Sequence, residues 1–120
     1  MATKKAKVVF VNAIERKAEV KEIPDDYREI QRELGCSIYS IVGRRIGGGR
    51  KVFDIYHDDN FLFAPRTGKR TGQCVNYDES LYENIFVARH TPSGAIKGLT
   101  DEEIAMVLDN VRAGVLLYSL

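Results

Sequence analysis

The segment "SIYSIVGRRIGGGRKVFDIYH", Ser37 to His57, decides the fold of this chain. Both of its ends are rich in β-branched and aromatic residues, which is typical of strands. The glycines Gly47–Gly49 lie between them and supply the backbone freedom that a turn needs. The sequence therefore predicts a long β-hairpin. Four basic residues surround its tip: Arg44, Arg45, Arg50 and Lys51.

The residues before this hairpin predict another hairpin and a helix. "KAKVVFVN" (5–12) alternates apolar and polar residues, and "AEVKEI" (18–23) alternates again, so both should be strands. In "PDDYREIQRELG" (24–35), Asp25 or Asp26 can cap a helix and Gly35 can end it. The residues expected to be buried are Ala18, Val20 and Ile23 on the strand and Tyr27, Ile30 and Leu34 on the helix.

The residues after the central hairpin predict turns, short strands and a loop. Asp58–Asn60 should be a turn and Phe61–Ala64 a strand. Pro65–Tyr77 is polar and predicts a surface loop, with a short strand at "QCV" (73–75). "ENIFVARH" (83–90) predicts a last strand. Ile85, Val87 and Arg89 would share one face of it, and Asn84, Phe86, Ala88 and His90 the other.

A C-terminal helix is the best-marked element of the sequence. Thr100 and Glu103 have the spacing of a capping box, and acidic residues follow Thr100 in the first turn. Its apolar face would consist of Ile104, Val107, Leu108, Val111 and Val115. Together the elements predict an α+β fold: an antiparallel β-sheet with about two α-helices packed on one face.

Composition narrows the possible classes of protein. With 120 residues, 44% of them hydrophobic, the chain should form one ligand-binding domain over residues 1–120. A net charge of +1 disfavours a nucleic-acid partner, although basic residues gather between Gly43 and Arg70. Cys36 and Cys74 lack CxxC spacing and are expected to be thiols. No apolar run reaches the ~18 residues of a membrane span, so we expect a cytoplasmic protein without a membrane partner or a cofactor.

The glycine-rich turn does not have the pattern of a nucleotide-hydrolysing loop. A P-loop requires GxxxxGK[ST] between a strand and a helix; "GRRIGGGRK" (43–51) lacks that pattern, and "TGKRTG" (67–72) has Arg70 where Ser or Thr is needed. Two interpretations remain. The backbone N–H groups of Gly47–Gly49 can form an anion site beside Arg44, Arg45, Arg50 and Lys51, or the turn is a flexible tip with solvated charges.

The last strand carries groups that suit a nucleotide. Asn84, Phe86, Arg89 and His90 offer an amide, an aromatic ring and cations, which can bind a base edge, a base face and a phosphate. Arg112 lies at the edge of the predicted C-terminal helix stripe and is a further candidate. The alternatives are that Phe86 belongs to the core and that the arginines form structural salt bridges.

Catalytic residues are less evident. His57, Asp58 and Asp59 could form a metal-dependent phosphodiesterase site, but a turn rich in Asp and Asn explains them more simply. There is no GxSxG elbow, and neither His57 nor His90 has an obvious nucleophile. We therefore expect a protein that is not an enzyme and holds no metal.

Several segments together resemble a family of short phage and mobile-element proteins: "VVFVN" (8–12), "EVKEIPDDYREIQRELGC" (19–36), "SIYSIVGRRIGGG" (37–49), "FDIYHDDNFLF" (53–63) and "ENIFVARHTPSGAIKGLTDEEIAMVL" (83–108). The resemblance covers roughly residues 7–111. Within that group, the chain is similar to phage anti-Thoeris sponge proteins. These sequester cyclic ADP-ribose isomers made by bacterial immune sensors without cleaving them, and some also hold cyclic oligonucleotides.

The resemblance implies a homo-oligomer, a dimer or a hexamer, with ligand sites shared between subunits in the cytoplasm of the host. It implies ligand contacts from Asn84, Phe86 and Arg112. The expected function is therefore an anti-defence sponge for a cyclic nucleotide signal. The alternative is a phage regulatory module that binds nucleic acid or protein through the basic hairpin Arg44–Lys51.

Overall fold

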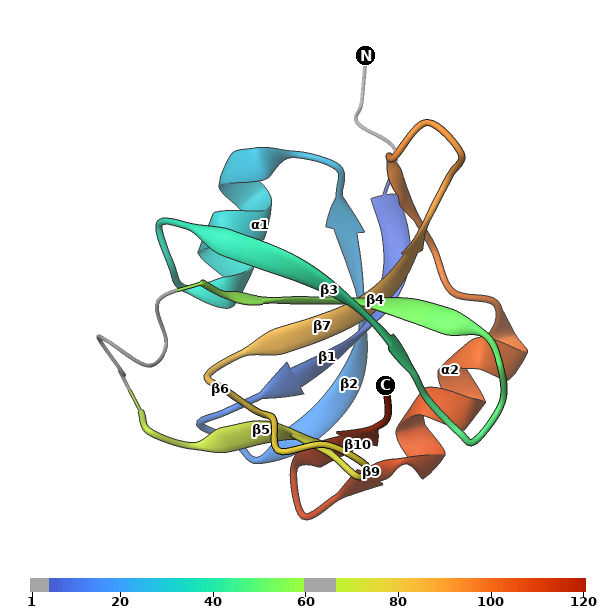
Figure 1. Ribbon diagram of the computed structural model, residues 1–120. Helices are drawn as coiled ribbons and strands as arrows, with labels where there is room; N and C mark the ends of the chain where they lie inside the picture. The colour runs from blue at the N-terminus through green and yellow to red at the C-terminus, as the bar shows by residue number, and fades with distance from the viewer. Residues whose placement is uncertain (1–4, 60–66) are drawn as a thin grey trace.

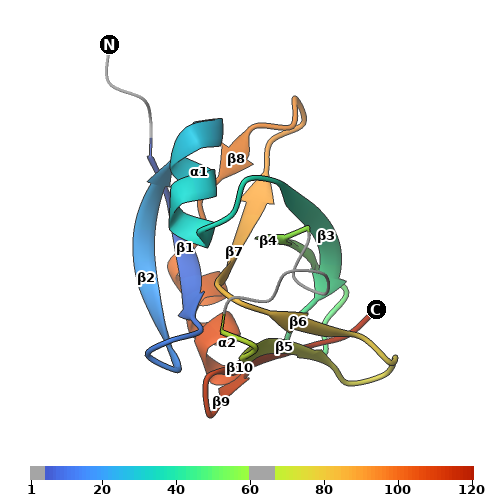
Figure 2. The same ribbon diagram turned by 90° about the vertical axis from the view of Figure 1, so that its left-hand side faces the viewer.

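The computed structural model describes residues 5–59 and 67–120 and has the predicted α+β class. Two sheets and two helices build it (Figures 1 and 2). The elements are β1 (Lys5–Asn12), β2 (Lys17–Pro24), α1 (Tyr27–Leu34), β3 (Tyr39–Arg45), β4 (Val52–Asp58), β5 (Arg70–Cys74), β6 (Ser80–Tyr82), β7 (Ile85–His90), β8 (Ile96–Lys97), α2 (Asp101–Asp109), β9 (Val111–Arg112) and β10 (Val115–Tyr118). Neither helix is long and apolar enough to cross a membrane, among the residues described.

The larger sheet has the strand order β2-β1-β7-β4-β3, with β8 paired to the end of β7. All of its pairings are antiparallel. The predicted hairpins are its two outer pairs: β1 with β2, and β3 with β4. The strand β7 lies between β1 and β4, so the segment that carried the predicted nucleotide groups is the centre of the sheet.

A smaller sheet has the order β6-β5-β10-β9 and includes one parallel pair, β5 with β10. The predicted loop was wrong for residues 70–72, which belong to β5, whereas the short strand predicted at residues 73–75 overlaps the end of β5. The strand packs closely at Gly72, where a Cβ would lie 3.1 Å from both the Leu81 and the Tyr118 side chains. The predicted strand Phe61–Ala64 lies outside the described residues.

The helix α1 agrees with its predicted boundaries. The Asp26 side chain accepts hydrogen bonds from the N–H groups of Arg28 and Glu29, and Gly35 ends the helix in the left-handed conformation at φ 70°. Ile30 and Leu34 are buried as expected, whereas Tyr27 is 56% exposed. Alternate residues of β1, including Val8 and Phe10, face α1 and form one core with Phe86.

The other face of the larger sheet covers a second core. Val9 and Val11 of β1 and Val87 of β7 pack there against the smaller sheet and against Val107 of α2. The helices therefore lie on opposite faces of the larger sheet, and the expectation that they share one face was wrong. Adjacent strand residues point to opposite faces, and β1 is apolar on both, so each face needed its own cover.

The C-terminal helix is shorter than its apolar pattern predicted. Its capping box forms as expected, with Thr100 and Glu103 exchanging hydrogen bonds. It ends at Asp109, however, and Val111 and Val115 belong to β9 and β10. Ala113 and Gly114 turn the chain between these strands at φ 52° and 78°. The i, i+3, i+4 spacing was produced by a helix followed by a hairpin.

Candidate functional site

The ring of Phe86 lies in the core, with no exposed surface. It stacks on Tyr56 with 4.4 Å between ring centroids and 13° between planes, under α1. A stacked, fully covered ring gives no face to a nucleobase. In this structure Phe86 therefore stabilises the fold, and the stacking role predicted for it has no accessible surface.

Asn84 precedes β7 and connects two distant segments. Its Oδ1 accepts a hydrogen bond from Ala13 N at 2.8 Å, and its Nδ2 donates to Glu33 O at 3.4 Å. The amide thus joins the β1–β2 turn to the end of α1. Because both ends of the side chain already have backbone partners, Asn84 acts as a structural link here.

Arg89 and His90 point to opposite faces of β7. Arg89 Nη1 donates to Glu103 Oε2 at 2.7 Å, and its guanidinium lies 5.6 Å from the centroid of Phe53. His90 Nδ1 is 2.7 Å from Asp54 Oδ2, and its side chain is 61% exposed. The four groups predicted on β7 consequently do not surround one ligand-sized space.

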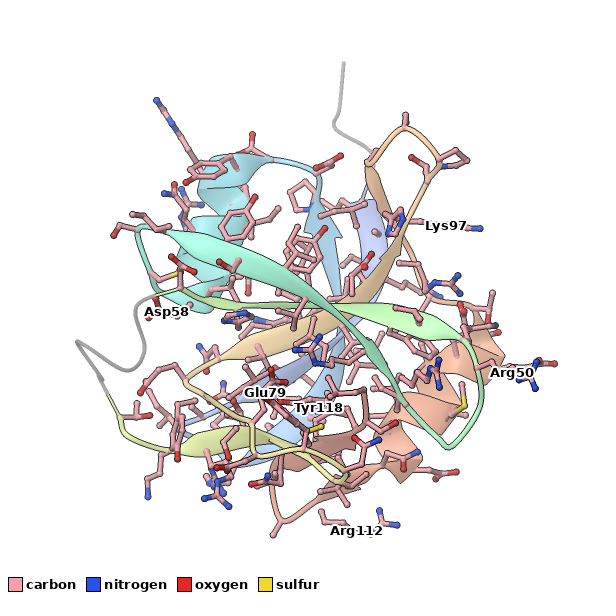
Figure 3. All side chains as sticks on the ribbon, in the orientation of Figure 1. Arg50, Asp58, Glu79, Lys97, Arg112 and Tyr118 are labelled. Atoms are coloured by element: carbon pink, nitrogen blue, oxygen red, sulfur yellow. The ribbon has the colours of Figure 1, made fainter. Side chains whose placement is uncertain are left out.

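Arg112 lies on β9 and not on a helix, which corrects the prediction. Its Nη1 folds back toward the end of α2, where it donates to Asp109 O and, at 3.2 Å, to Val111 O. A cation at this position satisfies carbonyl groups that a helix C-terminus leaves free. Figure 3 shows Arg112 on the opposite side of the molecule from Lys97 at the end of β8.

In the fold, the basic residues of the hairpin differ: some form salt bridges with carboxylates, whereas others are exposed to solvent. Arg44 forms a two-pronged salt bridge with Glu79, with Nε–Oε2 at 2.9 Å and Nη2–Oε1 at 2.5 Å. Tyr118 donates its hydroxyl to the same carboxylate at 2.9 Å (Figure 3). The bonds from Arg44 hold the pKa of Glu79 below its ordinary value, while burial and the adjacent carboxylate raise the pKa of Tyr118.

Lys51 also has a carboxylate partner. Its Nζ lies 3.1 Å from Glu103 Oε2, the atom that Arg89 contacts from another direction. Burial of Glu103 raises its pKa, but the Thr100 N–H and the two cations together outweigh that effect and lower the pKa to about 2. Arg44 and Lys51 therefore hold the hairpin against the second sheet and α2.

Arg45 is exposed, and it lines a pocket of about 160 Å³ at the tip of the hairpin. Gly47 and Gly48 contribute backbone to the same pocket, with φ of 85° and 76°. No group in the described part of the chain accepts a hydrogen bond from either N–H. We call this space the tip pocket; its lining is Arg45, Gly47, Gly48, Val75, Asn110, Leu117, Tyr118 and Ser119.

The two glycines are required for different reasons. A Cβ at Gly47 would lie 2.5 Å from Met106 Sδ, because the tip rests on α2. A Cβ at Gly48 would meet nothing within 4 Å, so only its positive φ favours glycine. Arg50, just beyond, projects outward from the hairpin (Figure 3) and does not line the tip pocket. Of the residues predicted to form the anion site, Arg45, Gly47 and Gly48 line the tip pocket together, whereas Arg44, Arg50 and Lys51 do not line it.

Sequence reasoning missed the rest of the tip pocket. Asn110 falls within the longer predicted helix, Val75 falls within the short strand predicted at residues 73–75, and Leu117 and Ser119 have no predicted role. Only their pairing brings them together: Val75 N donates to Tyr118 O, and Ser119 and Arg45 exchange backbone hydrogen bonds at 2.8 Å. No local signal marks such long-range pairs.

A larger space of about 260 Å³ lies between the start of β1, β8 and the residues before α1. Its charged lining residues are Lys5, Lys97 and Asp25, and Asp25 Oδ2 accepts a hydrogen bond from Ile96 N at 3.3 Å. Asp25 thus places a carboxylate in this wall, whereas the charged residue that lines the tip pocket is a cation, Arg45. We therefore regard the tip pocket as the candidate site.

The catalytic alternative at the end of β4 has no assembled site. His57 and Asp58 are buried, with 7% and 2% exposure, and Ser40 donates its hydroxyl to Asp59. Within residues 5–59 and 67–120, no three His, Cys, Asp or Glu side chains cluster closely enough to hold a metal ion. Cys36 and Cys74 do not form a disulfide.

Comparisons with known proteins add no assignment. No family model matches the chain, and no curated protein or solved structure is significantly similar to it. The resemblance to anti-Thoeris sponge proteins therefore stays a prediction.

Proposed function

We propose that this protein binds a small phosphate-bearing ligand without cleaving it. The observation that carries the proposal is the tip pocket, which is lined by Arg45 and by two glycines whose N–H groups have no hydrogen-bond acceptor among the described residues. A guanidinium and backbone N–H groups are donors that suit phosphate oxygens. Asn110 and Ser119 add polar atoms at the rim.

The size of the tip pocket limits what it can hold. Ligand pockets usually enclose ~300–1,000 Å³, whereas the tip pocket has about 160 Å³. It would therefore take a phosphate or pyrophosphate group, with the remainder of the ligand lying over Val75 and Leu117. Val75 is 64% exposed and provides an apolar surface for that contact.

A cyclic nucleotide immune signal, such as a cyclic ADP-ribose isomer, is the specific ligand we propose. It carries a pyrophosphate that suits the tip pocket, and a sponge needs neither a nucleophile nor a general base. The hydroxyl of Tyr118, a residue of the lining, already donates a hydrogen bond to the Glu79 carboxylate. The proposed protein acts in the cytoplasm of the host cell and releases its ligand unchanged.

The nucleic-acid alternative is weaker because two of the four hairpin cations are already neutralised. Arg44 binds Glu79 and Lys51 binds Glu103. Binding to a nucleic-acid backbone depends on Lys and Arg side chains that neutralise many phosphates together. Arg45 and Arg50 alone provide too few contacts for such a surface.

The test is ligand depletion followed by recovery. The protein is incubated with cyclic ADP-ribose, passed through a filter, and then heat-denatured to release what it holds. Intact ligand in the heated fraction supports sequestration; cleaved product would indicate an enzyme, and undiminished free ligand would refute this choice of ligand. Pyrophosphate is tested in parallel by calorimetry, and no binding of either probe would overturn the proposal.

Matched arginine variants locate the site. Arg45→Gln should weaken binding by roughly 10- to 100-fold, because a charge-assisted hydrogen bond is worth ~1.5–3 kcal/mol. Arg112→Gln removes an exposed cation from β9, outside the tip pocket, and should leave affinity within about twofold. Equal losses in both variants would assign binding to general charge and not to the tip pocket.

A further inference from the structure

Within residues 5–59 and 67–120, one tyrosine contributes no side-chain contact to the fold. The sequence has six tyrosines. Five of them are held by ring contacts, hydrogen bonds or partial burial: Tyr27, Tyr39, Tyr56, Tyr82 and Tyr118. Tyr77 is 62% exposed, and its side chain forms no hydrogen bond or ring contact with any described residue. An aromatic ring in that position is available to a ligand.

Tyr77 belongs to a turn that runs along the tip pocket. Val75, two residues before it, lines the pocket, and the Val75 N–H donates to Tyr118 O at 2.8 Å. One residue further, Asn76 Oδ1 accepts a hydrogen bond from Leu120 N at 2.9 Å. The turn therefore lies beside the C-terminal end of the chain, which forms part of the pocket lining.

Arg45 lies on the other side of the same C-terminal segment. Ser119 exchanges backbone hydrogen bonds with Arg45, whereas Tyr118 O and Leu120 N bond toward the turn. Backbone groups alternate sides along a strand in this way. Because neighbouring strands lie ~4.8 Å apart, the backbones of Arg45 and Val75 are separated by roughly 10 Å. A nucleotide can span such a distance between its phosphates and its base.

The turn offers a ligand an apolar and preformed surface. Val75, Tyr77 and Leu120 are 64%, 62% and 46% exposed, so this side of the tip pocket carries apolar residues. Hydrogen bonds close the turn, from Glu79 N to Tyr77 O at 3.0 Å and from Cys74 N to Glu79 O at 2.9 Å. A surface that is already ordered loses less entropy when a ligand binds to it.

We propose that Tyr77 stacks against the aromatic base of a ligand whose phosphates lie in the tip pocket, so that the protein selects nucleotides over inorganic phosphates. The inference rests on the proposed function, because it takes the phosphates to bind beside Arg45. An exposed tyrosine ring offers a flat apolar face, which suits a planar base. Since stacking of this kind tolerates any base, Tyr77 separates ligands that carry a base from those that lack one and does not distinguish adenine from guanine.

Pyrophosphate and ADP test the proposal, because ADP adds a nucleoside to the same pair of phosphates. Calorimetry should show that wild type binds ADP roughly 5- to 150-fold more tightly than pyrophosphate, which is the gain expected from stacking one base. Tyr77→Ala should lose this preference and keep its affinity for pyrophosphate. Tyr77→Phe retains an aromatic ring and should keep the preference.

Tyr27→Ala is the matched control, since Tyr27 is similarly exposed, at 56%, but lies on α1. It should keep the wild-type preference for ADP. If wild type binds pyrophosphate and ADP equally, or if Tyr77→Ala keeps the preference, the role of Tyr77 is overturned while the tip pocket stands. Equal losses in Tyr77→Ala and Tyr27→Ala would overturn that role too. If neither probe binds, the proposed function fails, and this inference fails with it.

Discussion

The two sides of the β3–β4 hairpin use the same residue types for different purposes. On one side, Arg44 and Lys51 are held by Glu79 and Glu103 against the second sheet and α2. On the other, Arg45 borders the tip pocket and has no carboxylate partner among the described residues. Adjacent side chains on a strand point to opposite faces. Arg44 and Arg45 are neighbours on β3, so their side chains lie on different faces of the sheet. A cluster of basic residues in a sequence therefore does not measure the positive charge available to a ligand.

The largest effect on the paired side should come from Glu103→Ala. This change leaves Lys51 and Arg89 without their shared carboxylate and removes half of the capping box. We expect a loss of ~2–4 kcal/mol in the free energy of unfolding, because Glu103 is buried and hydrogen-bonded. Urea denaturation measures it. Glu102→Ala, exposed in the same turn, is the control and should cost less than about 0.5 kcal/mol.

Acid should weaken the same side of the hairpin. The folded-state pKa of Glu103 is about 2, against an ordinary 4.5, so its contribution is complete above pH 4.5 and is lost as the pH falls toward 2. The shift corresponds to roughly 3 kcal/mol. Denaturation between pH 6 and pH 2 should show this loss, and Glu103→Gln should reduce the slope. An unchanged slope in that variant would assign the acid sensitivity to other carboxylates.

Arg44→Met and Arg45→Met compare the two sides directly. Arg44→Met removes two hydrogen bonds to the Glu79 carboxylate and keeps the one from Tyr118, so it should cost ~1–2 kcal/mol. Arg45→Met should change stability by less than about 0.5 kcal/mol while weakening ligand binding. Thermal or urea denaturation and calorimetry measure the two quantities. If Arg45→Met were the more destabilising change, the division between structural and available charge would be wrong.

A small difference between two variants is expected for the two glycines of the tip. Gly47 and Gly48 both have positive φ, so alanine should strain the backbone at each by ~1 kcal/mol. Gly47→Ala should cost a further ~0.5–1 kcal/mol, because its Cβ must displace the flexible side chain of Met106. The difference between the two variants isolates that contact. Equal losses would mean that the tip does not rest on α2.

Local patterns in the sequence determined most of the secondary structure. The strands β1 to β4 and β7 and the helix α1 follow from apolar alternation, capping residues and glycines, which act within a few residues. The capping box likewise fixed where α2 begins. The α+β class could also be predicted, because the sequence patterns show several strands and about two helices, and the apolar faces of these elements have to be buried against one another.

The tertiary structure decided what those patterns could not. Val111 and Val115 fit a helical stripe, yet they lie in strands because β9 pairs with β10, β10 pairs in turn with β5, and the chain turns at Ala113 and Gly114 with positive φ. Phe86 became core because it stacks on Tyr56, a residue far away in sequence. The tip pocket arose in the same way, since Arg45 meets Ser119 across 74 positions. Sequence patterns are local, whereas strand pairing and burial are not, so the fold was readable from the sequence and the site was not.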